Sequence, residues 1–143
     1  MNLRRAAWIW VIGLLVLAGL VSCQQSPDSH EYQDYTLHDI CTTAERDSYV
    51  KVRGVLKSPD TIIEQNRRYR VLMVEDVAQA QPWLGLWIPV GKGNNQAHPV
   101  PEKFTLADFK VQKQDGQVVG HGDTVVIWGR YGVSCEVYVD RIE

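Results

Sequence analysis

The chain has 143 residues, with 15 Lys and Arg against 17 Asp and Glu, and its formal net charge is −2 at pH 7. Proteins that bind nucleic-acid backbones non-specifically carry a surplus of basic residues, so this charge balance argues against that class. Without the N-terminal segment described next, about 120 residues remain, which is enough for one domain with one core.

The first 22 residues have the build of an export signal. Arg4 and Arg5 form a short positive region, and residues 6–21 form an uncharged apolar stretch of 16 residues. This stretch is shorter than the roughly 20 residues that span a bilayer. The polar segment QQSPDSHEYQD follows without the basic cluster that favours a retained anchor. Removal of the two arginines leaves 13 basic residues against 17 acidic ones, a mildly acidic mature chain.

The apolar stretch ends in LVSC at positions 20–23. This tetrapeptide resembles the lipobox of bacterial lipoproteins, in which the signal is cleaved before a cysteine whose thiol receives a diacylglycerol. The resemblance implies a signal peptide over 1–22, lipid attachment at Cys23, and a location on the extracytoplasmic side of a membrane. Gln24 is not the aspartate that retains many such proteins at the inner membrane, which favours the outer membrane if the organism has one. An ordinary signal peptide and an uncleaved anchor helix are the alternatives.

Two cysteines remain once Cys23 is lipidated, namely Cys41 and Cys135. Export places them where a disulfide persists, and two cysteines permit a single intramolecular pairing. In the chain-entropy account, a bridge closing a loop of about 94 residues contributes on the order of 4 kcal/mol. Two buried free thiols are the alternative.

Residues 23–40 are predicted to be the lipidated cysteine and a polar tether. A helical turn is expected in TLHDICTTAE, capped by Thr36 with Asp39 three residues later. From Ser48 onward, apolar residues recur with the period of two that is typical of strands. Five strands are expected, with a bend at Gly54 in the first: SYVKVRGVLK, RYRVLMVED, WLGLWIPV, GDTVVIWGRY and GVSCEVYVDRIE. A long connection over residues 91–122, with a small hairpin around Asp115-Gly116, separates the third strand from the fourth.

The order and patterns of these strands have a familiar counterpart. YVKVRGVL, YRVLMVED, and GDTVVIWGRY followed by VYVDRIE resemble the OB-fold, a five-stranded Greek-key barrel, and in particular small exported bacterial OB-fold proteins. The resemblance implies that residues 41–143 form an all-β, OB-like barrel with a long connection between strands 3 and 4. An SH3-like barrel and a sandwich fragment are the alternatives. These motifs specify a barrel much better than a ligand.

The resemblance directs attention to strands 2 and 3, whose outer face binds ligands in OB barrels. If Leu84, Leu86 and Ile88 point into the core, Trp83 and Trp87 point outward. In strand 2, the same reasoning with Leu72 and Val74 inside places Tyr69, Val71 and Met73 outside, near Arg68 and Arg70. The candidate ligand-binding residues are therefore Tyr69, Arg70, Trp83 and Trp87.

Two states of this face are compatible with the sequence. An open face would suit a nucleic acid, a glycan or a peptide. Alternatively, the connection over residues 91–122 folds across the face and buries it, because its apolar residues need a place to pack. These residues are Phe104, Leu106, Phe109 and Val111.

No motif indicates catalysis, and we expect no metal and no cofactor. The histidines are scattered, and His38 with Cys41 lacks the second ligand pair of a zinc site. The residue patterns of OB-fold thermonucleases and of the haem chaperone of cytochrome c maturation do not map onto the chain. We therefore expect a noncatalytic binding or scaffolding module of the cell envelope, held to the membrane by its lipid and directed at an unidentified envelope protein or ligand. The alternative is binding of single-stranded nucleic acid or oligosaccharide through the strand 2–3 face; nucleic acid is not the favoured partner.

Overall fold

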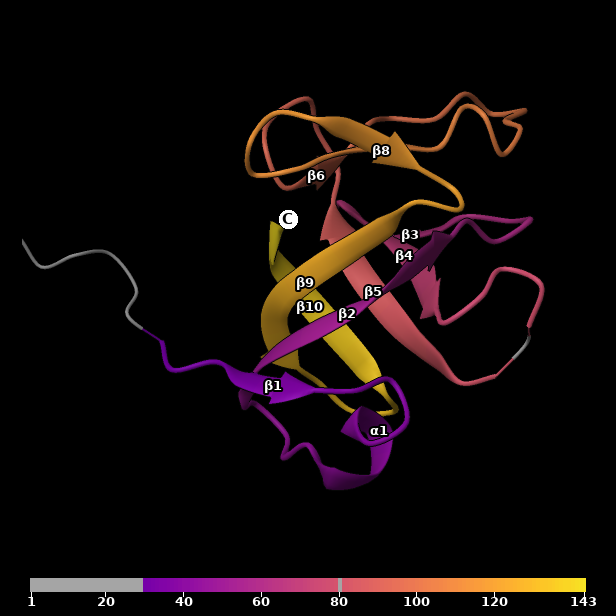
Figure 1. Cartoon of the computed structure of the whole chain (residues 1–143). Coiled ribbons are helices and arrows are strands. Elements are labelled where there is room, and N and C mark those ends of the chain that lie inside the picture. The colour runs from indigo at the N-terminus through magenta and orange to yellow at the C-terminus, as the bar shows by residue number, and fades with distance from the viewer. Residues whose placement is uncertain (1–29, 80) are drawn as a thin grey trace, which may run out of the picture.

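The segments with alternating apolar residues form β-strands, and the described part of the chain contains almost no helix. The computed structural model describes residues 30–79 and 81–143, so the predicted signal peptide and Cys23 lie outside the described residues. The sole helix among the described residues is α1 (Ile40–Thr43). The strands are β1 (Gln33–Tyr35), β2 (Tyr49–Lys57), β3 (Ile63–Gln65), β4 (Arg68–Val74), β5 (Trp83–Pro89), β6 (Gln96–Ala97), β7 (Lys110–Gln112), β8 (Val118–Gly120), β9 (Thr124–Tyr131) and β10 (Glu136–Ile142) (Figure 1).

Five of these strands close into a barrel in the order β2-β9-β10-β5-β4, and β4 returns to pair with β2. β5 and β10 run parallel, whereas the other neighbours in the barrel are antiparallel. The predicted all-β, five-stranded OB-like barrel is confirmed, and its strands 2 and 3 are β4 and β5. Gly54 allows the closure, because a Cβ at this position would lie 2.5 Å from Cγ of Met73 on β4.

The core is filled by alternate residues of each barrel strand, as the period of two predicts. Leu84, Leu86 and Ile88 of β5 are fully buried, as expected. In β4 the predicted orientation is wrong, since the core contains Tyr69, Val71 and Met73. The apolar run from Val71 to Val74 is compatible with either orientation. The two arginines decide it, because Arg68 and Arg70 share a face with Leu72, and burying two guanidinium groups would be costly.

Residues 91–122 close one end of the barrel. They contain β6, β7 and β8, which form a three-stranded sheet that lies above the barrel in Figure 1. Four of their apolar side chains join the barrel core: Ala97, Phe109, Val111 and Val119. The hairpin predicted around Asp115-Gly116 is present between β7 and β8, with Gly116 at a φ of +85°.

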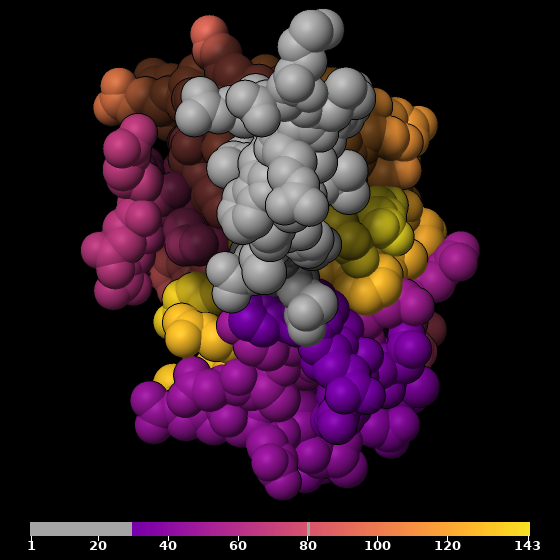
Figure 2. All heavy atoms as spheres, turned by 90° about the vertical axis from the view of Figure 1, so that its left-hand side faces the viewer, coloured from indigo at the N-terminus to yellow at the C-terminus, as the bar shows by residue number. Residues whose placement is uncertain are grey.

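The other end of the barrel is closed by the segment around α1. Leu37 and Ile40 are buried in the core, and a disulfide joins Cys41 to Cys135, with Cα atoms 4.9 Å apart. The predicted pairing is thereby confirmed. Figure 2 shows both ends from the side, with the indigo and purple N-terminal part at the bottom and orange residues of the connection at the top.

The domain extends further toward the N-terminus than the predicted boundary at residue 41. β1 pairs in parallel with β2, and the ring of His30 stacks on Tyr49 with centroids 3.8 Å apart. Thr36 caps the following turn as predicted: its Oγ1 accepts from the Asp39 N–H at 3.2 Å and donates to the Asp39 carboxylate at 2.7 Å. Short polar strands such as QDY have no apolar periodicity, so this part of the fold had no signal in the sequence.

Candidate ligand-binding site

The outer surface of β4, β5 and β10 brings together side chains from distant parts of the chain. The strand register places Arg70 opposite Trp87, and Trp87 opposite Tyr138. Two residues along each strand, and so on the same face, Gly85 lies opposite Glu136. Since side chains alternate between the two faces of a strand, these residues project outward as one group.

Glu136 is at the centre of this group and holds two of the predicted ligand-binding residues. Its Oε1 accepts a hydrogen bond from Arg70 Nε at 2.8 Å, and its Oε2 accepts one from Trp87 Nε1 at 2.8 Å. The side chain of Glu136 is 16% exposed and that of Arg70 is 29% exposed, so the ion pair is shielded from water and charge-assisted. Gly85 provides the space, because a Cβ there would lie 3.0 Å from Cγ of Glu136.

Three of the four predicted ligand-binding residues meet on this face. Trp83 is half-buried, with the Arg70 guanidinium 5.9 Å from its ring centroid. Trp87 is 8% exposed, so its ring offers little stacking surface. Tyr69 is excluded from this face, because its side chain enters the core and its hydroxyl oxygen accepts from the N–H of Val100 at 3.3 Å.

Arg68 also lies on this face. In the sequence it is a neighbour of the candidate residues and was not included among them. Its Nη1 donates to the carbonyl oxygens of Trp87 at 3.0 Å and Val139 at 3.3 Å. The guanidinium also lies 6.0 Å from the centroid of the Tyr138 ring, and Arg130 approaches the same ring at 5.9 Å. No carboxylate of the described residues forms an ion pair with Arg68. Its orientation is fixed by backbone carbonyls, and further N–H groups of the guanidinium are left for a ligand.

Two adjoining grooves share Arg68 as a wall. The smaller, about 100 Å³, is lined by Gln65, Asn66, Arg68, Trp87 and Tyr138. The larger, about 340 Å³, is lined by His30, Tyr32, Tyr49, Arg68, Pro89, Val139 and Asp140. Together they form the Arg68 groove. The tight turn between β3 and β4 forms part of its rim, because positive φ angles at Asn66 and Arg67 are those of a type I′ hairpin.

The connection over residues 91–122 contributes no residue to the lining of the Arg68 groove. Its apolar residues Phe109 and Val111 enter the end of the barrel instead, while Phe104 is half-buried and Leu106 is 46% exposed. Of the two expected states, covering of this face by the connection is therefore not observed at the groove.

Glu136 and Tyr138 were missed by sequence reasoning. The pattern E-V-Y-V-D of β10 predicts that Glu136, Tyr138 and Asp140 project outward. However, the parallel pairing of β10 with β5 connects residues about 50 positions apart, and local periodicity does not encode it.

A guanidinium fixed among aromatic rings and amide side chains is suited to binding a polar ligand with hydroxyl, carbonyl or anionic oxygens. Within residues 30–79 and 81–143, no group of three or more His, Cys, Asp or Glu side chains is placed to hold a metal ion. No helix in the same part of the chain is long and apolar enough to cross a membrane. No family model matches the sequence, and no curated protein matches it either.

Proposed function

We propose that the chain is a bacterial lipoprotein of the cell envelope. The motif LVSC at 20–23 and the preceding apolar stretch carry this proposal. The disulfide between Cys41 and Cys135 supports it, because disulfides persist in exported proteins and the pairing leaves Cys23 available for a lipid.

The anchor is tested with Cys23→Ala and the unaltered chain expressed in a bacterium that processes lipoproteins. The unaltered chain should partition into detergent, and its intact mass should show loss of residues 1–22 and gain of acyl groups. Cys23→Ala should lose the acyl mass. If the variant partitions like the unaltered protein at its full unprocessed mass, the N-terminus is a membrane anchor helix and the lipoprotein proposal is wrong.

The barrel is proposed to be a noncatalytic binding or scaffolding module for an envelope protein or ligand, with the Arg68 groove as its contact surface. The observation that carries this proposal is the Arg68 guanidinium, which is held by two backbone carbonyls and has no carboxylate partner among the described residues. A buried or half-buried arginine in a purely structural role is normally balanced by a carboxylate, as Arg70 is by Glu136.

A second candidate is single-stranded nucleic acid or oligosaccharide bound in the same groove. Tyr138, Tyr49 and the amides of Gln65 and Asn66 favour it, because aromatic rings and amides contact bases and sugars. The mildly acidic mature chain and the small exposed area of Trp87 weigh against nucleic acid in this pair.

Tryptophan fluorescence of the mature chain tests the groove, because Trp87 lines it. The probes are a mixed-sequence single-stranded oligonucleotide at two salt concentrations and a neutral oligosaccharide. Arg68→Gln removes the groove cation, and Arg46→Gln removes an exposed arginine outside the groove as the matched control. Binding that is salt-sensitive and lost only in Arg68→Gln supports nucleic acid, whereas salt-insensitive binding with the same variant pattern supports oligosaccharide. Any probe that binds equally to all three proteins contradicts the assignment of the groove.

A further inference from the structure

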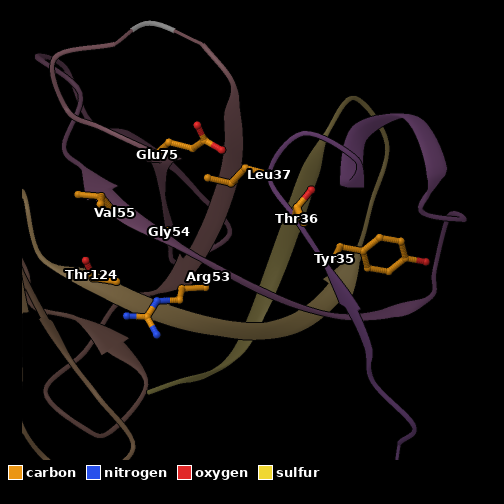
Figure 3. Close-up of a pocket in the computed structure, with 8 residues that line it drawn as sticks. All are labelled: Tyr35, Thr36, Leu37, Arg53, Gly54, Val55, Glu75 and Thr124. Atoms are coloured by element: carbon orange, nitrogen blue, oxygen red, sulfur yellow. The ribbon is translucent and has the colours of Figure 1, made fainter.

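A second groove lies where β2 changes its pairing partner, and it shares no lining residue with the Arg68 groove. It has a volume of about 410 Å³ and is lined by Tyr35, Thr36, Leu37, Arg53, Gly54, Val55, Glu75 and Thr124. Figure 3 shows the walls, with the segment of Tyr35 to Leu37 on one side and Glu75, which follows β4 directly, on another. We call it the Arg53 groove.

The backbone of β2 is incompletely paired in the Arg53 groove. One edge of β2 pairs with β9 continuously from Tyr49 to Val55. The other edge pairs with β1 over Val50–Val52 and with β4 over Val55–Lys57. Arg53 and Gly54 therefore have a strand partner on the β9 side alone. A strand edge without a partner is where an extended peptide adds by backbone hydrogen bonds.

The segment after β1 cannot fill this gap itself. Leu37 leaves the strand direction and packs into the core over Gly54, where a Cβ would lie 3.0 Å from Leu37 Cδ1. Thr36 is held by its hydrogen bonds with Asp39 in the turn before α1. The chain is thereby turned away from β2 after Tyr35, and the space beside Arg53 and Gly54 stays open as a groove.

Opposite charges flank the gap. Arg53 is exposed and, within the described part of the chain, its side chain makes no hydrogen bond or ion pair. Among residues 30–79 and 81–143, Glu75 has one ion-pair partner, His38, at 3.0 Å, and both side chains are well exposed. Exposed pairs of this kind are weak, so a ligand can compete for the carboxylate. In Figure 3, Arg53 and Glu75 lie on opposite sides of the β2 ribbon.

We propose that the Arg53 groove binds a dipeptide-sized zwitterion in an extended conformation. The backbone of the ligand adds to β2 beside Arg53 and Gly54, its carboxylate binds the Arg53 guanidinium, and its amino group approaches Glu75. The length fits, because two residues of β2 span about 7 Å, the same as two residues of an extended peptide. The charges fit as well, since guanidinium with carboxylate is a favoured bidentate pair. This site goes beyond the function proposed above and uses different residues.

The test is calorimetric titration of the full-length chain in detergent with Ala-Ala. The methyl side chains of Ala-Ala are small enough to fit without a shaped pocket. Its carboxylate, its amino group and its backbone therefore determine the affinity. Binding should weaken about tenfold or more with Ala-Ala amide, which lacks the carboxylate, because a charge-assisted hydrogen bond is lost. Arg53→Gln should weaken the binding of Ala-Ala by a similar factor. N-acetyl-Ala-Ala, which lacks the amino group, and Glu75→Gln should each weaken it by a smaller factor.

A control variant makes the outcome specific. Arg46→Gln removes another exposed arginine, which lies outside both grooves, and should leave the affinity for Ala-Ala unchanged. Arg53 is exposed, so its variant should keep the melting temperature of the unaltered chain. The proposal is overturned if Ala-Ala gives no binding heat at millimolar concentration, if the amide binds as well, or if Arg53→Gln has no effect. Unchanged affinity for N-acetyl-Ala-Ala would refute the role of Glu75. If this proposal fails, the proposal for the Arg68 groove is unaffected, because Arg68→Gln is tested there with an oligonucleotide and an oligosaccharide.

Discussion

At the α1 end of the barrel, closure depends on a covalent link, whereas at the opposite end it depends on packing of residues 91–122. The α1 end has a few residues, with Leu37 and Ile40 in the core and the disulfide from Cys41 to the β9–β10 turn. The other end has a three-stranded sheet with a fully buried phenylalanine, Phe109. A short segment cannot bury enough apolar surface to close a barrel end by itself. The disulfide supplies the missing stability, because it links the segment covalently to the barrel.

The largest expected effect is at the covalently closed end. Replacing Cys41 and Cys135 together with alanine should lower the free energy of unfolding by about 4 kcal/mol, because the unfolded chain is released from a long closed loop. Urea unfolding of the unaltered and doubly substituted mature chains measures the difference. Equal midpoints would show that both ends are closed by packing, and the comparison of the two ends would then fail.

Phe109→Ala is the matching change at the packed end. Phe109 is fully buried, and its truncation should cost about 3–4 kcal/mol through lost burial and the cavity left behind. Leu106→Ala is the control in the same connection, because Leu106 is 46% exposed, and it should change stability by less than about 0.5 kcal/mol. If both variants behave alike in urea unfolding, Phe109 does not close the barrel.

A smaller effect is expected where the packed end joins β2. The Nδ1 atom of His121 accepts a hydrogen bond from the backbone N–H of Ser58 at 3.1 Å, and Ser58 is 4% exposed. His121→Ala leaves this buried N–H without an acceptor and should cost about 1–2 kcal/mol. His38→Ala at the other end removes an exposed pair with Glu75 and should cost at most about 0.5 kcal/mol. Thermal unfolding of both variants measures the two losses of stability. Equal losses would contradict a structural role for the hydrogen bond to His121.

The smallest effect is a pH dependence at the packed end. The backbone N–H of Thr105 first, and its hydroxyl second, hold the pKa of Asp108 below its usual value. The ionised carboxylate therefore stabilises the fold above the pKa of the unfolded chain, and this contribution is lost as the pH falls through the lower, folded pKa. Asp108→Asn should be less stable than the unaltered chain at pH 7, with the gap narrowing below about pH 4. A constant gap across that range would contradict the role of the carboxylate.

The barrel could be predicted because the patterns that indicate its strands lie within short stretches of sequence. Only a few residues are needed to recognise the alternating valines of β2 and β9. The same is true of the turn at Gly122-Asp123 directly before β9. The orientation of β4 could not be predicted in this way, because Val71 to Val74 is apolar throughout and only the solvation of Arg68 and Arg70 distinguishes its faces. Neither groove was readable, since each depends on register between strands that are distant in the chain. The ion pair of Arg70 with Glu136 joins positions 66 residues apart.

The stacking of His30 on Tyr49 has a consequence for any ligand held in the envelope. With a lipid on Cys23, as proposed, the chain from Cys23 to His30 spans at most about 25 Å even when fully extended. His30 and Tyr49 both line the Arg68 groove, so the groove would stay within a few nanometres of the lipid surface. A linker of this length gives a ligand in the same membrane an effective concentration at the groove in the millimolar range. Weak, rapidly reversible binding would then be enough for occupancy, and soluble ligands would have to bind far more tightly to compete.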